Sequence, residues 1–237
     1  MLGVVQRSAR VGASSARLQR WGSVNDINNQ VEYWNDVAWK KEFTHSIDLS
    51  LLHELLPLDS RILDFGCGYG RVCQELVQAG YRDVTGVDSS AEMVRRGRRQ
   101  YPDLRLETLG PSGLSYPASS FDAVLLIAVL TCVPEDQGQE ALIAALKALL
   151  RPGALIYISD YLLQADERNQ QRYQQHVSEF GRYGIFRLPE GAVVRHHSRE
   201  WLQSLTHDLE TLKVDQVDAM TMNGHAIRAL RYVGRKR

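Results

Sequence analysis

Short apolar runs alternate with amphipathic helical patterns across residues 61–159, and this alternation restricts the chain to a parallel α/β sheet. The apolar runs predict buried strands at residues 61–65, 83–87, 104–109, 121–128 and 154–159. The patterns between them predict helices at residues 71–80, 89–99 and 139–150. Strands separated by helices in this way pair in parallel and are covered by helices on both faces. The sequence therefore predicts a doubly wound, Rossmann-like sheet.

The helix predicted at residues 71–80 has one apolar side and a defined end. Val72, Leu76 and Val77 recur at helical spacing, so we expect all three on the buried side. Gly80 follows the last apolar position, which is where a helix commonly ends.

The alternation stops after Asp160. A polar helical pattern covers residues 165–180, an irregular segment follows, and residues 198–209 are again helical. Two late apolar runs, at 211–217 and 226–233, predict an antiparallel pair at the sheet edge.

The N-terminus differs in composition from the rest of the chain. Residues 1–25 contain Arg7, Arg10, Arg17 and Arg20 but no acidic residue. This composition is typical of a mitochondrial transit peptide and also fits a disordered leader. We therefore expect residues 1–30 to be a disordered or leader segment. A cytoplasmic location is expected, with the mitochondrion as the alternative.

One domain is expected over residues 31–237. It would carry an aromatic helical cap at its start, around Tyr33 and Trp34, and an acceptor-side insert at about 162–200. A chain of 237 residues is long enough to bury a core of this kind.

The amino-acid composition limits the classes of partner that the chain is expected to bind. The 28 basic residues balance 28 acidic ones, so no basic surplus supports binding to nucleic acid. No apolar run approaches the roughly 18 residues that span a bilayer, so no membrane partner is expected. The three cysteines form no paired motif and predict a reducing compartment. Monomer and homodimer remain open.

The motif Asp64-Phe65-Gly66-Cys67-Gly68-Tyr69-Gly70 carries the strongest chemical signal. It follows the first strand and opens a helix, where glycines allow a tight turn and close approach of a ligand. The spacing differs from the GxGxxG of nicotinamide enzymes and from the GxxxxGK[ST] of P-loops. Asp88 ends the second strand, where a carboxylate can accept hydrogen bonds from both hydroxyls of a ribose.

These residues resemble class I S-adenosylmethionine (SAM)-dependent methyltransferases. The matching segments, in the family's order, are ILDFGCGYG (62–70), VTGVDSS (84–90), LSYPASSFDAVLL (114–126) and LLRPGALIYISDY (149–161). The resemblance implies a seven-stranded sheet of order 3-2-1-4-5-7-6, with the seventh strand antiparallel. Later segments, such as DERNQQRY (166–173), resemble bacterial members.

The resemblance also implies a set of cofactor contacts. Asp64 would bind the amino group of SAM, Gly66, Cys67 and Gly68 would line its methionine portion, and Asp88 would hold the ribose. The full set of implied cofactor residues is Asp64, Gly66, Cys67, Gly68, Gly70, Asp88, Ser89, Met93, Leu109, Ile127 and Ala128. Many members carry an acidic residue after the third strand, where this chain has Thr108-Leu109-Gly110.

The predicted function is transfer of the SAM methyl group to a small-molecule acceptor by in-line displacement, with S-adenosylhomocysteine (SAH) as product. The Asn/Asp-Pro-Pro-aromatic motif of amino-DNA methyltransferases is replaced by Ala128-Val129-Leu130-Thr131, which favours a small molecule. Two alternatives remain: a SAM-binding regulatory or scaffold module without catalysis, and a Rossmann-type oxidoreductase.

Ligands of doubly wound sheets bind over the carboxyl ends of the strands, which selects the acceptor-side candidates. We expect the acceptor to contact Thr131, Tyr161, Arg168, Arg172, Tyr183 and Arg195. The arginines suit a carboxylate or phosphate on the substrate. Candidate catalytic residues are His196, His197 and Tyr173. Adjacent histidines on an extended segment point in opposite directions, and no residues at metal-ligand spacing indicate a bound ion.

Overall fold

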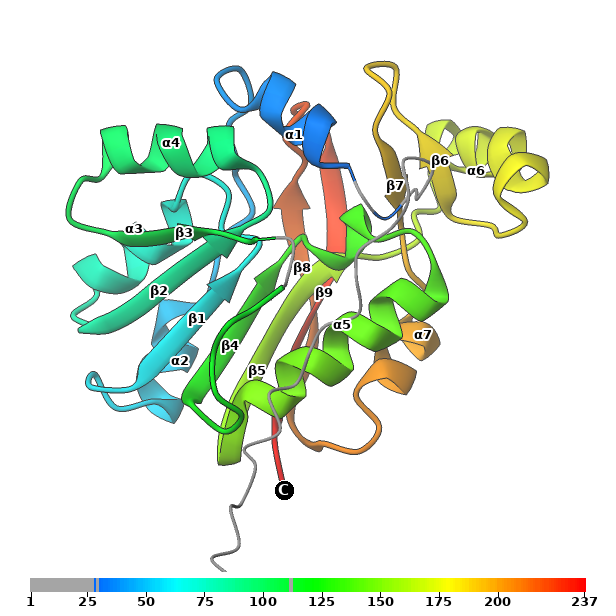
Figure 1. The fold of residues 1–237 in the computed structure, drawn as a ribbon. Coiled ribbons are helices and arrows are strands. Elements are labelled where there is room, and N and C mark those ends of the chain that lie inside the picture. Colours follow the sequence, from blue (N-terminus) through cyan, green and yellow to red (C-terminus); the bar gives the residue numbers. More distant parts are fainter. Residues whose placement is uncertain (1–27, 29, 111–112) are drawn as a thin grey trace, which may run out of the picture.

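The computed structural model describes residues 28, 30–110 and 113–237. A seven-stranded sheet of order β3-β2-β1-β4-β5-β9-β8 forms its centre (Figure 1). The strands are β1 (Arg61–Phe65), β2 (Asp83–Asp88), β3 (Arg105–Thr108), β4 (Phe121–Ile127), β5 (Leu150–Tyr161), β8 (Glu210–Met220) and β9 (Ala226–Arg235). Strand β9 pairs antiparallel with both β5 and β8, whereas β1 to β5 pair in parallel. The predicted fold class and strand order are confirmed.

Alternate residues of each central strand enter two separate cores. In β1, Leu63 and Phe65 face α5 (Asp136–Leu149) and α7 (Arg199–Leu205) on one side of the sheet. Ile62 faces α2 (Leu49–Leu55) and α3 (Arg71–Gln78) on the other side. Because both faces are covered, the central strands are almost entirely apolar, as parallel sheets require.

Burial of α3 differs from the prediction at one position. Val72, Cys73 and Leu76 are buried, but Val77 is 43% exposed. At about 100° of rotation per residue, Val72, Leu76 and Cys73 fall within one arc of the helix, and Val77 lies beyond Cys73 at the edge of that arc, where solvent reaches it.

Several predicted bounds also differ from the structure. Helix α5 begins at Asp136, three residues before the predicted start, and β5 extends through the expected turn to cover Leu150–Tyr161. Helix α7 ends at Leu205, earlier than expected. Such shifts at element ends follow from capping and fraying that periodicity does not resolve.

The segment predicted to be irregular contains a hairpin. Strands β6 (Ile185–Arg187) and β7 (Val193–Arg195) pair antiparallel beside α6 (Glu167–Phe180). Together with α1 (Val31–Val37), these elements stand above the carboxyl ends of the central strands (Figure 1). They are therefore placed to cover any ligand bound at that edge.

Helices of the described residues do not reach the length and apolar character that crossing a membrane requires. The predicted leader falls almost entirely outside the described residues, which begin with Asn28 and Gln30.

Candidate functional site

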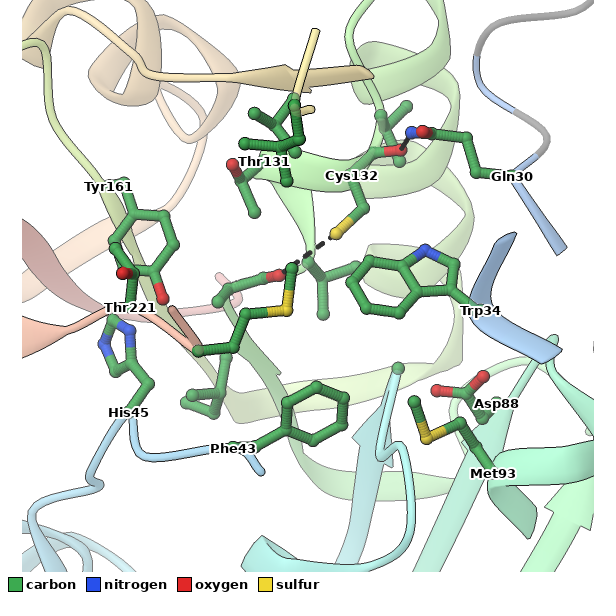
Figure 2. A pocket seen from close by; sticks show the side chains of 18 of the residues that line it. Gln30, Trp34, Phe43, His45, Asp88, Met93, Thr131, Cys132, Tyr161 and Thr221 are labelled. Atoms are coloured by element: carbon green, nitrogen blue, oxygen red, sulfur yellow. Dashed lines mark hydrogen bonds between the residues drawn. The ribbon is translucent and has the colours of Figure 1, made fainter. Parts of the chain in front are cut away.

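A cavity of about 840 Å³ lies over the carboxyl ends of β1, β2, β4 and β5. One part is formed by the loops after β1, β2 and β4, and the other by α1, α6, the β6–β7 hairpin and the β8–β9 turn. Figure 2 shows Asp88 and Met93 on one side of the space, and His45, Tyr161 and Thr221 on the other, with Trp34, Phe43 and Cys132 between them. The cavity therefore joins two unlike regions.

The glycine-rich loop forms the floor of the first region. Gly66 has φ +73° and Gly68 has φ +56°, a backbone region that favours glycine. A Cβ at Gly66 would lie 2.6 Å from Cγ2 of Val129, and one at Gly68 would meet the ring of Phe43. The loop thus provides bare backbone where a ligand has to approach closely.

Asp88 ties this loop to the end of β2. Its two carboxylate oxygens accept hydrogen bonds from the backbone N–H groups of Gly68 and Ser90, each at 2.8 Å. Burial raises the pKa of Asp88, and the N–H groups of Ser90 and Gly68 oppose that rise. A half-buried carboxylate lining a cavity beside a glycine loop suits a ligand that donates hydroxyl hydrogen bonds.

Asp64 lies at the other end of the loop, at the end of β1. Burial raises its pKa to about 7, and the Cys73 thiol donates a hydrogen bond to its Oδ2 at 3.3 Å. A carboxyl group in this state would be ionised by a cationic ligand group, such as an ammonium, placed beside it.

Predicted cofactor residues gather in this first region. Those that line the cavity are Asp64, Gly66, Cys67, Asp88, Ser89, Met93, Leu109, Ile127 and Ala128. Gly68 and Gly70 do not line it. Gly68 instead donates to Asp88, and Gly70 has φ +85° and precedes the first residue of α3. Their place is in shaping the loop.

Polar bonds between distant segments close the second region. The side chain of Gln30 donates to the carbonyls of Cys132 (3.0 Å) and Val193 (2.7 Å) and accepts from the N–H of Val193. The ammonium of Lys41 bonds Glu190 at 2.8 Å and Asn223 at 2.5 Å. The N-terminal segment, the hairpin and the β8–β9 turn are thereby tied together over the cavity.

His45 is a site residue that the sequence analysis did not single out. Its Nε2 lies 2.7 Å from Oγ of Ser159, and its ring stands 5.3 Å from that of Tyr161. Burial, helped by the nearby Arg71 charge, lowers its pKa to about 4, so the imidazole is neutral. The aromatic and histidine content of residues 31–46 was the available signal, but periodicity alone does not show which side chain points inward.

The two adjacent histidines occupy different environments. His196 lines the cavity. His197 is fully buried outside it, with Nε2 2.8 Å from Nε2 of Gln139 and Nδ1 3.2 Å from the carbonyl of Tyr161. The prediction of a catalytic His197 is therefore corrected, because its ring is fully occupied in the protein interior.

The positions of three further side chains correct the roles predicted for them. Tyr173 is fully buried behind His196, and its hydroxyl lies 2.5 Å from Nδ1 of that ring. Arg195 is buried in a pair with Asp136 at 2.7 Å and does not line the cavity. Tyr183 is 44% exposed and packs its ring edge against Tyr173. The predicted acceptor residues that do line the cavity are Thr131, Tyr161, Arg168 and Arg172.

Replacement of His45 by glutamine should reduce the acid sensitivity of folding. The ring stays neutral in the folded state, whereas the unfolded chain binds a proton below the ordinary pKa of 6.5. Stability is therefore lost as pH falls from 6.5 toward 4, by about 2 kcal/mol at pH 5. Thermal unfolding of wild type and His45→Gln at pH 7.5 and pH 5 measures this. An equal fall of the unfolding midpoint between pH 7.5 and pH 5 in both proteins would contradict the low pKa of His45.

The fold and the loop together define a class. A seven-stranded sheet with a reversed β9, a glycine-rich turn after β1 and a carboxylate at the end of β2 is the arrangement of class I SAM-dependent methyltransferases. A family model described as "Methyltransferase domain" matches residues 38–211. The chain belongs to this family, and SAM as its cofactor is confirmed.

Individual relatives differ in what they methylate. EEF1A lysine methyltransferase 4 of Bos taurus is 38% identical over 124 residues, covering 47% of this chain and 48% of that protein. The chain thus matches about half the length of that relative. The 27-O-demethylrifamycin SV methyltransferase of Amycolatopsis mediterranei is 30% identical over 190 residues, covering 77% of this chain and 67% of that protein.

Among solved structures, a SAM-dependent methyltransferase from Methanosarcina mazei has a TM-score of 0.73 and 26% identity. The likeness covers 78% of this chain and 96% of that one.

Proposed function

We propose that this chain transfers the methyl group of SAM to a small molecule bound in the second region of the cavity. The observation that carries the proposal is the closure of that region by Gln30 and Lys41. Both side chains come from the N-terminal segment and bond the β6–β7 hairpin or the β8–β9 turn across the cavity. A methyltransferase acting on a folded protein needs its acceptor region open to a macromolecular surface, whereas here hydrogen bonds of its own chain cross that region.

The first region fits SAM by its shape and charge. We assign the ribose to Asp88, the methionine ammonium to Asp64 and the methionine backbone to the bare loop at Gly66 and Cys67. Met93 and Leu109 would contact the adenine. When bound, SAM supplies a methyl group already activated by its sulfonium.

The residues of this chain then have to position an acceptor and exclude water. Trp34 and Phe43 provide apolar walls between the two regions, and Tyr161 lies on the acceptor side (Figure 2). Holding the reacting atoms in line can supply up to about 7–11 kcal/mol of the barrier reduction. The structure therefore supports catalysis by positioning in a cavity with apolar walls.

The relative named for rifamycin methylation also supports a small acceptor, at 30% identity over 190 residues. The rifamycin relative matches 77% of this chain, whereas the lysine methyltransferase match covers 47%. A protein lysine is the second candidate acceptor.

Incubation with methyl-labelled SAM tests the proposal. Wild type is offered a deproteinised metabolite extract in one reaction and the matching total protein in another. We expect label in the small-molecule fraction of the first reaction and background label on protein in the second. Label on protein alone would overturn the small-molecule acceptor. SAH binding without transfer to either would favour the non-catalytic module.

A further inference from the structure

Two arginine side chains of α6 line the acceptor side of the cavity, with Arg172 half-buried and Arg168 exposed. Arg168 and Arg172 are four residues apart on the helix, so they share one face, and both line the cavity. Within the described part of the chain, neither guanidinium has a hydrogen-bond or ion-pair partner. Arg172 lies over the ring of Phe186, 4.6 Å from its centroid.

Two guanidinium groups in this position repel each other unless an anion joins them. Burial and the charge of Arg168 both lower the pKa of Arg172. Asp166, the N-cap of α6, accepts bonds from the backbone and side chain of Asn169, and its charge also acts on both arginines. Asp166 does not line the cavity, so the charge that α6 presents there is positive.

His196 adds a hydrogen-bond donor to this cluster. The backbone N–H of Gln164 donates to the Tyr173 hydroxyl oxygen at 3.2 Å. The hydroxyl proton is therefore directed to its other partner, Nδ1 of His196, at 2.5 Å. A neutral imidazole that accepts at Nδ1 carries its proton at Nε2. Burial keeps the pKa of His196 near 3, so this Nε2–H is a donor and not a base.

The acidic residues that line the cavity do not pair with this cluster. The acidic residues that line the cavity, among those the structure describes, are Asp64, Asp88 and Glu190. The two aspartates belong to the cofactor region, and Glu190 is paired with Lys41. An anionic ligand on the acceptor side would meet donors and positive charge.

We propose that the acceptor carries an oxyanion, a carboxylate or phosphate, held by Arg168, Arg172 and Nε2–H of His196. This rests on the proposed small-molecule function and names its substrate class. Two guanidinium groups withdraw charge from a bound oxyanion and make it a poor nucleophile, so the oxyanion is the anchor and another atom of the acceptor receives the methyl group. A cationic lysine side chain would be repelled from the same place.

Binding to the SAH-loaded protein tests the anchor without knowledge of the substrate. Benzoate, phenyl phosphate and the neutral benzamide are titrated by calorimetry. We expect saturable binding of at least one anion, at least tenfold tighter than benzamide. The tighter of the two anions identifies the anchor as carboxylate or phosphate. Equal affinities for all three compounds, or no anion binding, would overturn the proposal.

Substitution of each arginine tests where the anion binds. Arg172→Gln and Arg168→Gln should each weaken the preferred anion at least tenfold. Arg187→Gln is the matched control, because Arg187 pairs with Glu179 outside the cavity, and it should change affinity less than twofold. Equal losses in all three variants would reject the site. SAH affinity is measured in the same samples. If the wild type binds no SAH, the cofactor site is refuted instead.

Nitrogen NMR of labelled protein tests the role of His196 separately. We expect Nε2 to be protonated and Nδ1 unprotonated at pH 7, with the ring still neutral at pH 5. A ring protonated at Nδ1 only would remove His196 from the anchor.

Discussion

Replacing Asp88 with alanine should weaken SAM binding at least a hundredfold and leave a folded protein. The carboxylate holds the N–H groups of Gly68 and Ser90, so its loss frees the glycine-rich loop as well as removing the proposed ribose acceptor. A hydrogen bond to a charged group contributes about 1.5–3 kcal/mol, and the expected loss corresponds to about 2.8 kcal/mol. Calorimetric titration of SAM into wild type and variant measures it.

Asp83→Ala is the matched control for that experiment. Asp83 is the first residue of the same strand, at the end far from the cavity, where it pairs with Arg105 at 2.9 Å. An exposed ion pair of this kind contributes little, so SAM affinity should stay within twofold. An Asp88→Ala protein that binds SAM as tightly as Asp83→Ala would refute the assignment of the first region.

Replacing Gly97 with valine should lower the unfolding midpoint by about 6–12 °C. On an exposed helix surface, removal of glycine from α4 (Ala91–Gln100) would be favourable by up to about 1 kcal/mol. Here a Cβ would lie 2.6 Å from the backbone oxygen of Tyr69 and 2.5 Å from Leu106. Backbone cannot yield as a side chain can, so overpacking costs about 3 kcal/mol.

Tyr69 belongs to the glycine-rich loop, so the same substitution should weaken SAM binding. Thermal unfolding and SAM titration are measured together on Gly97→Val and on Arg99→Ala, an exposed change two residues along the helix. We expect Arg99→Ala to resemble wild type in both. A Gly97→Val protein of unchanged midpoint would contradict the packing of α4 against the loop.

The central sheet was predictable from sequence because its determinants are local. Strands β1 and β2 are short apolar runs, the first followed by Gly66 and the second ending at Asp88, and Ser90 caps α4 through its hydroxyl. The order of the strands follows from the family resemblance. Val77 was misplaced because two neighbouring apolar residues on a helix do not reveal which of them faces the sheet.

The acceptor side was less predictable because distant segments assemble it. Gln30 bonds Val193, 163 positions away, and Lys41 bonds Asn223, 182 positions away. Arg195 and Arg172 look alike in sequence. In the structure Arg195 is neutralised by Asp136, whereas Arg172 enters the cavity. Only the three-dimensional arrangement of the charges separates them.

Thermal unfolding of the wild type with SAM, SAH and NAD in parallel tests the central claim most directly. A ligand at 100 times its dissociation constant adds about 2.7 kcal/mol to stability. For a chain of this size the midpoint should rise by about 5–11 °C with SAM and SAH and stay unchanged with NAD. No rise with either SAM or SAH in a folded sample, or an equal rise with NAD, would contradict the account.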